Sequence, residues 1–144
     1  MATLVTGGTG FIGSNIVKTL AKKGHRIVSF DLVPPDELVR RYLEPWEDKI
    51  EYVQGNILKQ ADLEKVVGLG ITKIVHAAVF TGILPGIESS EAISIVDINV
   101  MGTTNLLELA RKVSLERFLY VSSGAVYGIG RPSDEVLYEE SPLR

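Results

Sequence analysis

Short apolar runs and longer stretches with helical spacing alternate along the 144-residue chain. Runs of β-branched and other apolar residues predict strands, and apolar residues three or four positions apart predict helices. The expected strands cover residues 4–6, 25–31, 50–54, 72–78 and 118–121. The expected helices cover residues 12–23, 36–43, 61–67 and 89–113. This alternation predicts an α/β fold with a doubly wound parallel sheet.

Four local signals refine these elements. Gly24 follows the first helical stretch and is expected to end it. Residues 72–78 are almost continuously apolar, which predicts a strand buried on both faces of a parallel sheet. Ser89 or Ser90 is expected to cap the last helix. Gly102 lies inside that helix, where glycine costs about 1 kcal/mol relative to alanine, so close backbone packing is expected there.

A glycine-rich turn follows the first expected strand. Gly8-x-Gly10-x-x-Gly13 satisfies the dinucleotide fingerprint, and Gly7-x-x-Gly10-x-x-Gly13 overlaps it. Phe11 and Ile12 then open a helix. A turn without side chains lets backbone N–H groups approach a phosphate, and the N-terminus of the helix favours its negative charge. The segment therefore predicts a phosphate-binding turn.

Asp31 lies at the C-terminal end of the second expected strand. This is the distance past the glycines at which an acid meets the adenosine ribose of a dinucleotide. A carboxylate there accepts hydrogen bonds from the ribose hydroxyls and repels a 2′-phosphate, so the sequence favours NAD over NADP as cofactor. The alternative is that Asp31 is only a solvated acid at a strand end.

The same features predict how the strands are ordered. Right-handed crossovers and a first strand that binds phosphate favour the order 3-2-1-4-5. Ligands of such a sheet bind beyond the carboxyl ends of the strands. The residues expected to converge there are Thr6 and Gly7, Asp31, Asn56, Ala77 and Ala78, and Ser122 and Ser123.

Composition narrows the function classes. The net charge is −3 and basic residues are scattered, which argues against a nucleic-acid partner. No apolar run approaches the roughly 20 residues of a membrane span, and no signal peptide is recognisable, so a cytoplasmic protein is expected. With no cysteine and two histidines, no thiolate or histidine-rich metal site is expected.

Five motifs in order resemble the extended short-chain dehydrogenase/reductase family of NAD-dependent epimerases and dehydratases, such as UDP-galactose 4-epimerase. They are Thr6-Gly-Gly-Thr-Gly-Phe-Ile-Gly13, Asp31, His76-Ala77-Ala78, Asn99-Val100-x-Gly102-Thr103-x-Asn105-Leu106-Leu107 and Ser122-Ser123-Gly124-Ala125-Val126-Tyr127-Gly128. The resemblance covers essentially the whole chain. It implies that residues 1–144 are an incomplete NAD(P)-binding Rossmann domain, truncated before the last strands and the C-terminal substrate-binding region.

The resemblance also implies roles for individual residues. Asn56 and Ile57 would flank the adenine, although the family more often has Asp at the position of Asn56. Asn99 would tie its helix to the loop after the fourth strand. The residues implied at the cofactor are Gly7, Gly10, Phe11, Ile12, Gly13, Asp31, Asn56, Ile57, Ala77, Ala78, Val79, Asn99, Val121 and Ser122.

Ser123 matches the catalytic Ser/Thr of the family. Its hydroxyl would hydrogen-bond the substrate oxygen that becomes a carbonyl. On its own, a serine after a strand is usually a turn residue. His76 at a strand end is interpreted as structural, and the family does not use the position of Tyr127 as the proton acceptor.

The proton acceptor of the family is a Tyr-x-x-x-Lys pair, which these residues lack; the closest match is Tyr127-x-x-x-Arg131. The sequence is therefore interpreted as the N-terminal part of a longer enzyme, inactive by itself. The complete enzyme would oxidise a substrate hydroxyl, on a nucleotide sugar, and would form a homodimer. Epimerase, dehydratase and dehydrogenase all remain open, although Gly124 and Ala125 disfavour a dehydratase. The alternative is a non-catalytic NAD-binding or regulatory module.

Overall fold

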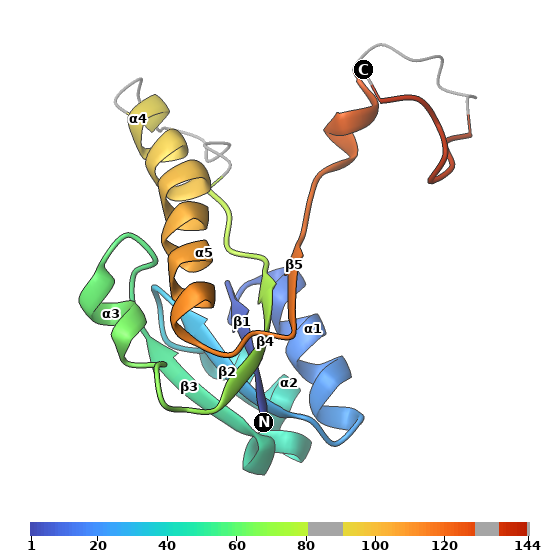
Figure 1. The fold of residues 1–144 in the computed structure, drawn as a ribbon. Helices are drawn as coiled ribbons and strands as arrows, with labels where there is room; N and C mark the ends of the chain where they lie inside the picture. Colours follow the sequence, from blue (N-terminus) through green and yellow to red (C-terminus); the bar gives the residue numbers. More distant parts are fainter. Residues whose placement is uncertain (81–90, 129–135, 144) are drawn as a thin grey trace.

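Five parallel strands form one sheet in the computed structural model, which describes residues 1–80, 91–128 and 136–143 (Figure 1). The strands are β1 (Ala2–Thr6), β2 (Arg26–Asp31), β3 (Ile50–Gln54), β4 (Ile71–His76) and β5 (Arg117–Tyr120). Their order is β3-β2-β1-β4-β5 and each neighbouring pair is parallel. The predicted fold class and strand order are confirmed.

Helices lie on both faces of this sheet, and the fourth of the five extends beyond it (Figure 1). They are α1 (Phe11–Lys22), α2 (Glu37–Leu43), α3 (Gln60–Glu64), α4 (Glu91–Val96) and α5 (Gly102–Lys112). The chain also forms two short 3-10 turns, η1 (Glu44–Lys49) and η3 (Gly124–Tyr127). Helix α1 ends as predicted, because Gly24 has a φ of +85°, which suits a residue without a side chain.

Two helices differ from the expectation. Residues 61–67 were expected to be helical, but α3 ends at Glu64 and the chain continues in turns. The long helix does reach Lys112, but it is interrupted by a π-helical turn, η2 (Asp97–Met101), between α4 and α5. Its expected cap, Ser89 or Ser90, lies outside the described residues. Turns of this kind often mark functional sites.

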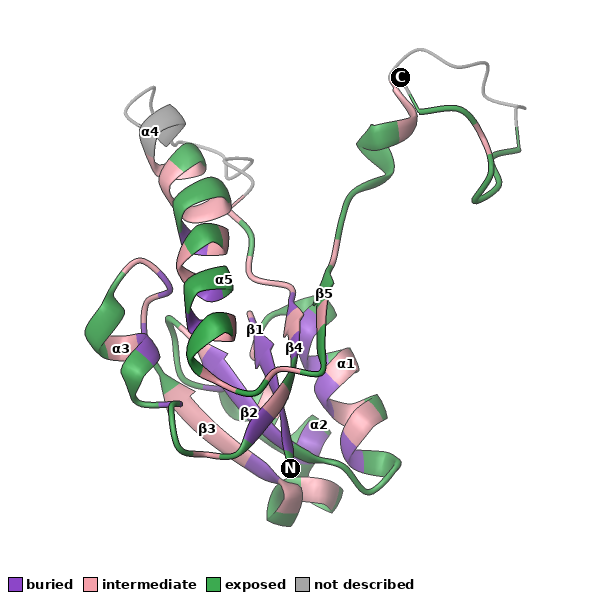
Figure 2. Ribbon diagram, viewed as in Figure 1, coloured by how far each residue is buried: buried purple, intermediate pink, exposed green. Residues whose placement is uncertain are grey.

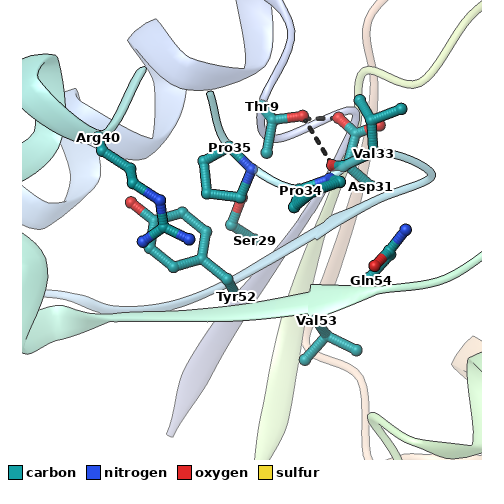
Figure 3. Close-up of a pocket in the computed structure, with 10 residues that line it drawn as sticks. All are labelled: Thr9, Ser29, Asp31, Val33, Pro34, Pro35, Arg40, Tyr52, Val53 and Gln54. Carbon is teal, nitrogen blue, oxygen red and sulfur yellow. Dashed lines mark hydrogen bonds between the residues drawn. The ribbon is translucent and has the colours of Figure 1, made fainter. Parts of the chain in front are cut away.

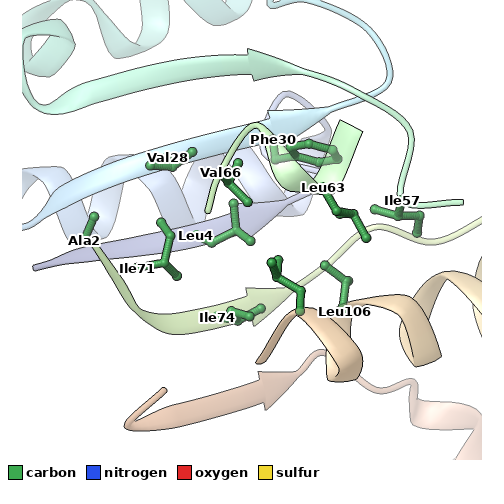
Figure 4. Close-up of a cluster of buried hydrophobic side chains, with 11 residues drawn as sticks. Ala2, Leu4, Val28, Phe30, Ile57, Leu63, Val66, Ile71, Ile74 and Leu106 are labelled. Atoms are coloured by element: carbon green, nitrogen blue, oxygen red, sulfur yellow. The ribbon is translucent and has the colours of Figure 1, made fainter. Parts of the chain in front are cut away.

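The two faces have separate apolar cores. On one face, α3 and α5 pack over the sheet around a cluster that Figure 4 shows in close-up. Its buried members are Ala2, Leu4, Val28, Phe30, Ile57, Leu63, Val66, Ile71, Ile74, Leu106 and Leu109. On the other face, α1 and α2 pack over Val5, Ile27 and Ile50. Gly102 makes a close approach as predicted, because a Cβ there would collide with the Ile57 side chain.

The fourth strand is less buried than its apolar sequence suggested (Figure 2). Ile71, Ile74 and His76 are buried, whereas the residues between them are partly or fully exposed. Leu119 in β5 is 47% exposed. The core between the sheet and helices α1 and α2 includes Val5, Ile27 and Ile50, and Val75 of β4 packs against it while staying partly exposed. Burial on both faces was therefore a wrong prediction for β4 in this chain.

Candidate cofactor-binding site

The glycine turn links β1 to α1 and presents bare backbone at the edge of the sheet. Gly7 has a φ of +68°, a conformation that favours glycine. A Cβ added to Gly7 would lie 2.8 Å from the backbone nitrogen of Ala78. A Cβ added to Gly13 would collide with the carbonyl oxygen of Gly7. The turn therefore packs so tightly against α1 and the end of β4 that only glycine fits at these two positions.

The N-terminus of α1 is open to an anion. Its N-cap is Gly10, and no side chain caps the first turn. Phe11 and Ile12 begin the helix and are 85% and 52% exposed. Uncapped N–H groups in the first turn of a 12-residue helix, reinforced by the helix dipole, suit a pyrophosphate. One turn thus contains Gly7, Gly10, Phe11, Ile12 and Gly13, and their contact with the cofactor stays a prediction.

Asp31 is held at the end of β2 by the glycine turn (Figure 3). Its Oδ2 accepts a hydrogen bond of 3.0 Å from the backbone N–H of Thr9. The Thr9 hydroxyl reaches the carbonyl of Val33 at 3.3 Å. Asp31 Oδ1 has no hydrogen-bond partner among the described residues. One carboxylate oxygen is thus fixed, and the other is available to a ribose hydroxyl.

Thr9 is the residue at this site that the sequence analysis missed. The signal was present, because Thr9 is the variable residue between Gly8 and Gly10 of the fingerprint. Its backbone joins the glycine turn to Asp31, and its side chain donates to the loop after β2.

A hollow of about 200 Å³ lies beside Asp31, between the loop after β2 and strand β3 (Figure 3). Ser29 and Tyr52 are among the residues that line it, and their hydroxyl oxygens are buried without a hydrogen-bond partner among the described residues. Burial raises the pKa of the Tyr52 phenol, Glu47 raises it further, and Arg40 opposes them. The hollow adjoins Asp31 and Thr9 and is lined on its other sides mainly by apolar groups, including Val33 and Pro34.

A backbone hydrogen bond joins the ends of β3 and β2. Beyond it, the Asn56 side chain bonds within its own turn, whereas the Ile57 side chain lies in the core. Gly55 donates its N–H to the carbonyl of Asp31 at 2.8 Å. Asn56 Oδ1 accepts from the N–H of Leu58 at 2.8 Å, so this side chain stabilises its own turn. Ile57 is 6% exposed and packs in the core. Their contact with adenine stays a prediction.

Asp62 supports the same turn. Its carboxylate accepts from the N–H of Asn56 at 2.9 Å and pairs with Lys65 at 2.6 Å. The Lys65 ammonium, followed by the Asn56 N–H, lowers the pKa of the Asp62 carboxyl. Asp62, Asn56 and Lys65 line a second hollow at this end of the sheet.

The segment after β4 lies against β1 and is held at two points. Ala77 donates its N–H to the carbonyl of Thr6 at 3.2 Å, and Ala78 donates to the Thr6 hydroxyl at 3.3 Å. Farther along, Asn99 accepts from the N–H of Phe80 at 2.9 Å and donates to its carbonyl at 2.8 Å. The predicted tie between the Asn99 helix and this loop is confirmed, and Val79 lies between the two ties.

Ser123 lies on the chain that leaves the sheet after β5 (Figure 1). Val121 begins this segment beside β4, with its N–H 2.9 Å from the carbonyl of His76. Ser122 and Ser123 are exposed. Ser123 Oγ accepts from the N–H of Ala125 at 3.2 Å and caps η3. No recorded contact joins Ser123 to the glycine turn, so its catalytic role stays a prediction.

His76 is structural, as the sequence analysis proposed. It is 1% exposed and hydrogen-bonded on both ring nitrogens, to Thr6 and Thr103. Burial lowers the pKa of the imidazole to about 4, so the ring is neutral near pH 7.

A parallel sheet in the order 3-2-1-4-5, an uncapped glycine turn and an acid at the end of the second strand define a dinucleotide-binding protein. The sequence model of the NAD dependent epimerase/dehydratase family matches residues 3–144. The chain belongs to this family, which is NAD-dependent.

Two curated relatives and one solved structure illustrate the similarity. A 3-beta-hydroxysteroid dehydrogenase of Mycolicibacterium neoaurum is 35% identical over 125 residues, which are 85% of this chain and 32% of the relative. A UDP-glucose 4-epimerase of Schizosaccharomyces pombe is 33% identical over 129 residues, 87% of this chain and 36% of the relative. The structure of UDP-glucose 4-epimerase from Bifidobacterium longum with NAD⁺ and UDP has a TM-score of 0.83 and 26% identity, and the match covers 100% of this chain and 43% of that one.

The chain spans only about a third of the length of these curated relatives. Among the described residues, no helix has the length and apolar character that crossing a membrane requires.

Proposed function

We propose that this protein oxidises a hydroxyl group of its substrate by hydride transfer to NAD. The observation that carries the proposal is the joined edge of the sheet. There the uncapped N-terminus of α1 lies beside two hydrogen bonds from backbone to side chain. The N–H of Thr9 in the glycine turn donates to the carboxylate of Asp31, and the N–H of Ala78 after β4 donates to the hydroxyl of Thr6. When bound, NAD⁺ supplies the acceptor for the hydride that leaves the substrate carbon.

Different residues around the turn would bind different parts of the cofactor. The N–H groups of residues 11–13 would hold the pyrophosphate, because the N–H of Gly10 already donates to the carbonyl of Gly7. Asp31 Oδ1 would accept from the adenosine ribose. Asn56 and Ile57 would lie near the adenine. Residues 77–79 would support the nicotinamide half, because they lie against the opposite side of the glycine turn.

Ser123 would orient the substrate. Since its Oγ already accepts from the N–H of Ala125, its own O–H is available to donate to a substrate oxygen. Such a donor polarises the oxygen as the carbonyl forms. No Tyr-x-x-x-Lys pair occurs in the 144 residues, so we assign the proton-accepting step to no residue of this chain.

A nucleotide sugar is the first substrate we propose, because several relatives and structural neighbours are named UDP-glucose 4-epimerases. A 3β-hydroxysteroid is the second candidate, because hydroxysteroid dehydrogenases are 35% and 36% identical to the chain. Both substrates carry a secondary hydroxyl that the same first step, oxidation by hydride transfer to NAD⁺, would act on.

The test incubates NAD⁺ and either UDP-glucose or a 3β-hydroxysteroid with the complete enzyme, of which this chain supplies the N-terminal part in our proposal. Formation of UDP-galactose or of NADH is then measured. Ser123→Ala is expected to lower kcat by about one to several orders of magnitude without changing NAD⁺ affinity, and Ser123→Thr should retain activity. An unchanged kcat in Ser123→Ala would make Ser123 a turn residue. If the complete enzyme binds NAD⁺ but turns over no hydroxyl substrate, a non-catalytic NAD-binding module is favoured instead.

A further inference from the structure

A row of buried hydrogen bonds crosses the sheet behind the segment that follows β4. Its centre is His76, the last residue of β4. Nδ1 of His76 lies 2.7 Å from Oγ1 of Thr6, at the end of β1. Nε2 lies 2.9 Å from Oγ1 of Thr103, in α5. The row therefore connects the strand before the glycine turn with the helix that follows the β4 loop.

The direction of each bond follows from the available protons. Thr103 Oγ1 lies 2.6 Å from the carbonyl oxygen of Asn99, which can only accept. The single hydroxyl proton of Thr103 is therefore donated to Asn99. Because that proton is used, Nε2 of His76 must be the donor to Thr103.

The other side of the ring follows in the same way. A neutral imidazole that carries its proton on Nε2 has an accepting Nδ1, so the hydroxyl of Thr6 donates to His76. Thr6 Oγ1 in turn accepts the N–H of Ala78 at 3.3 Å. The four bonds thus run in one direction, from the N–H of Ala78 and the hydroxyl of Thr6 through His76 and Thr103 to the carbonyl of Asn99. Only the Nε2–H tautomer of His76 satisfies all four.

The surroundings of the ring keep it neutral. Phe118 and Tyr120 of β5 approach it edge-on, with centroid distances of 6.3 and 5.4 Å. Of these two neighbours, only Tyr120 has a titratable side chain. Among the described residues, no charged group contacts the imidazole of His76. Protonation of Nδ1 would force the Thr6 hydroxyl away from its acceptor.

The two ends of this row, Thr6 and Asn99, are the residues whose hydrogen bonds hold residues 77–80 in place. Thr6 receives the N–H of Ala78, which lies against Gly7 of the phosphate-binding turn. Asn99, whose carbonyl accepts from Thr103, holds Phe80 by two hydrogen bonds. The π-helical turn contains Asn99 and precedes Thr103 by one residue. A change in the row would thus move this segment relative to the turn.

We infer that Thr103 is a positioning residue of the cofactor site, which selects the Nε2–H tautomer of His76 and thereby fixes residues 77–80 against the glycine turn. The inference rests on the proposed function only in naming NAD as the molecule that this segment supports. Thr103 acts through His76 and Asn99, without contact with the cofactor.

Three variants test this role. Thr103→Val keeps the shape of the side chain and removes the hydroxyl, whereas Thr103→Ser keeps the hydroxyl. Thr104→Val is the matched control, because the Thr104 hydroxyl also donates to a carbonyl four residues earlier, that of Val100 at 3.0 Å. Thr104 is exposed and has no recorded contact with His76.

The measurements are ¹⁵N NMR of the His76 imidazole and titration with NAD⁺, both on the full chain. The wild type, Thr103→Ser and Thr104→Val should carry the imidazole proton on Nε2. Thr103→Val should shift the proton population toward Nδ1. It should also weaken NAD⁺ binding about three- to tenfold, the range expected for one lost hydrogen bond.

Three results would overturn the inference: a wild-type ring with its proton on Nδ1, a wild-type ¹⁵N pattern in Thr103→Val, or unchanged NAD⁺ affinity in that variant. Failure of the wild type to bind NAD⁺ would instead refute the proposed function. The ¹⁵N pattern would then still decide whether Thr103 selects the tautomer.

Discussion

Protonation of His76 should destabilise the fold between about pH 6.5 and pH 4. Burial lowers the pKa of the folded imidazole from 6.5 to about 4. Between these values the unfolded chain binds a proton that the folded chain does not, so the free energy of unfolding falls as the pH falls. One pKa unit corresponds to about 1.4 kcal/mol, so about 3 kcal/mol of stability present at pH 7 is lost by pH 4.

The assay compares urea unfolding of the wild type and His76→Asn across this pH range. The Asn side chain can accept from Thr6 in the place of Nδ1, but it does not titrate. Whatever the cost of the substitution at pH 7, the difference in stability between the two proteins should shrink by about 3 kcal/mol at pH 4. His25→Asn removes the other histidine, which is exposed, and should behave as the wild type.

A stability difference that stays constant with pH would refute this reasoning. If His76→Asn does not fold, NMR titration of the wild-type ring provides the same test, because its midpoint should lie near pH 4 rather than near 6.5. Asp62 does not obscure the result. Its pKa is lowered below 3.8, so the stability it contributes is lost only as the pH falls through that lower value.

Two substitutions test the packing of the site. Gly13→Ala should abolish NAD⁺ binding, because its Cβ collides with the Gly7 carbonyl. Gly124→Ala is the control and should bind NAD⁺ normally, because the space around Gly124 is open. Tight binding of NAD⁺ by Gly13→Ala in a calorimetric titration would contradict the described turn. Gly102→Ala should destabilise the fold by about 1 kcal/mol in urea unfolding, because overpacking against Ile57 outweighs the gain in helix propensity. Adding Ile57→Val should restore part of the loss, and a more stable Gly102→Ala would show that the contact is loose.

The sheet and the glycine turn at its edge could be predicted because they depend on local patterns. Glycine spacing, the acid at the end of β2 and the alternation of strands with helices are all readable within short windows. The close approach at Gly102 and the Asn99 tie were also predicted, one from helix propensity and the other from a family resemblance.

The hydrogen-bond row could not be predicted, because its members are far apart in the sequence. Thr6 and His76 are separated by 70 positions, and His76 and Thr103 by 27. The burial of β4 was misjudged for a related reason. An apolar strand sequence shows that the strand can be buried on both faces. It does not show that a helix of the same chain covers each face.

The account rests on a dinucleotide site in which Asp31 selects NAD, and a paired titration tests it directly. NAD⁺ and NADP⁺ are titrated into the full chain and into Asp31→Ala. Asp48→Ala, which removes an exposed acid paired with Lys49, serves as the control for charge. The wild type and Asp48→Ala should bind NAD⁺ about tenfold or more tightly than NADP⁺, and Asp31→Ala should lose this preference. Equal affinities for the two cofactors, unaffected by Asp31→Ala, would contradict the account.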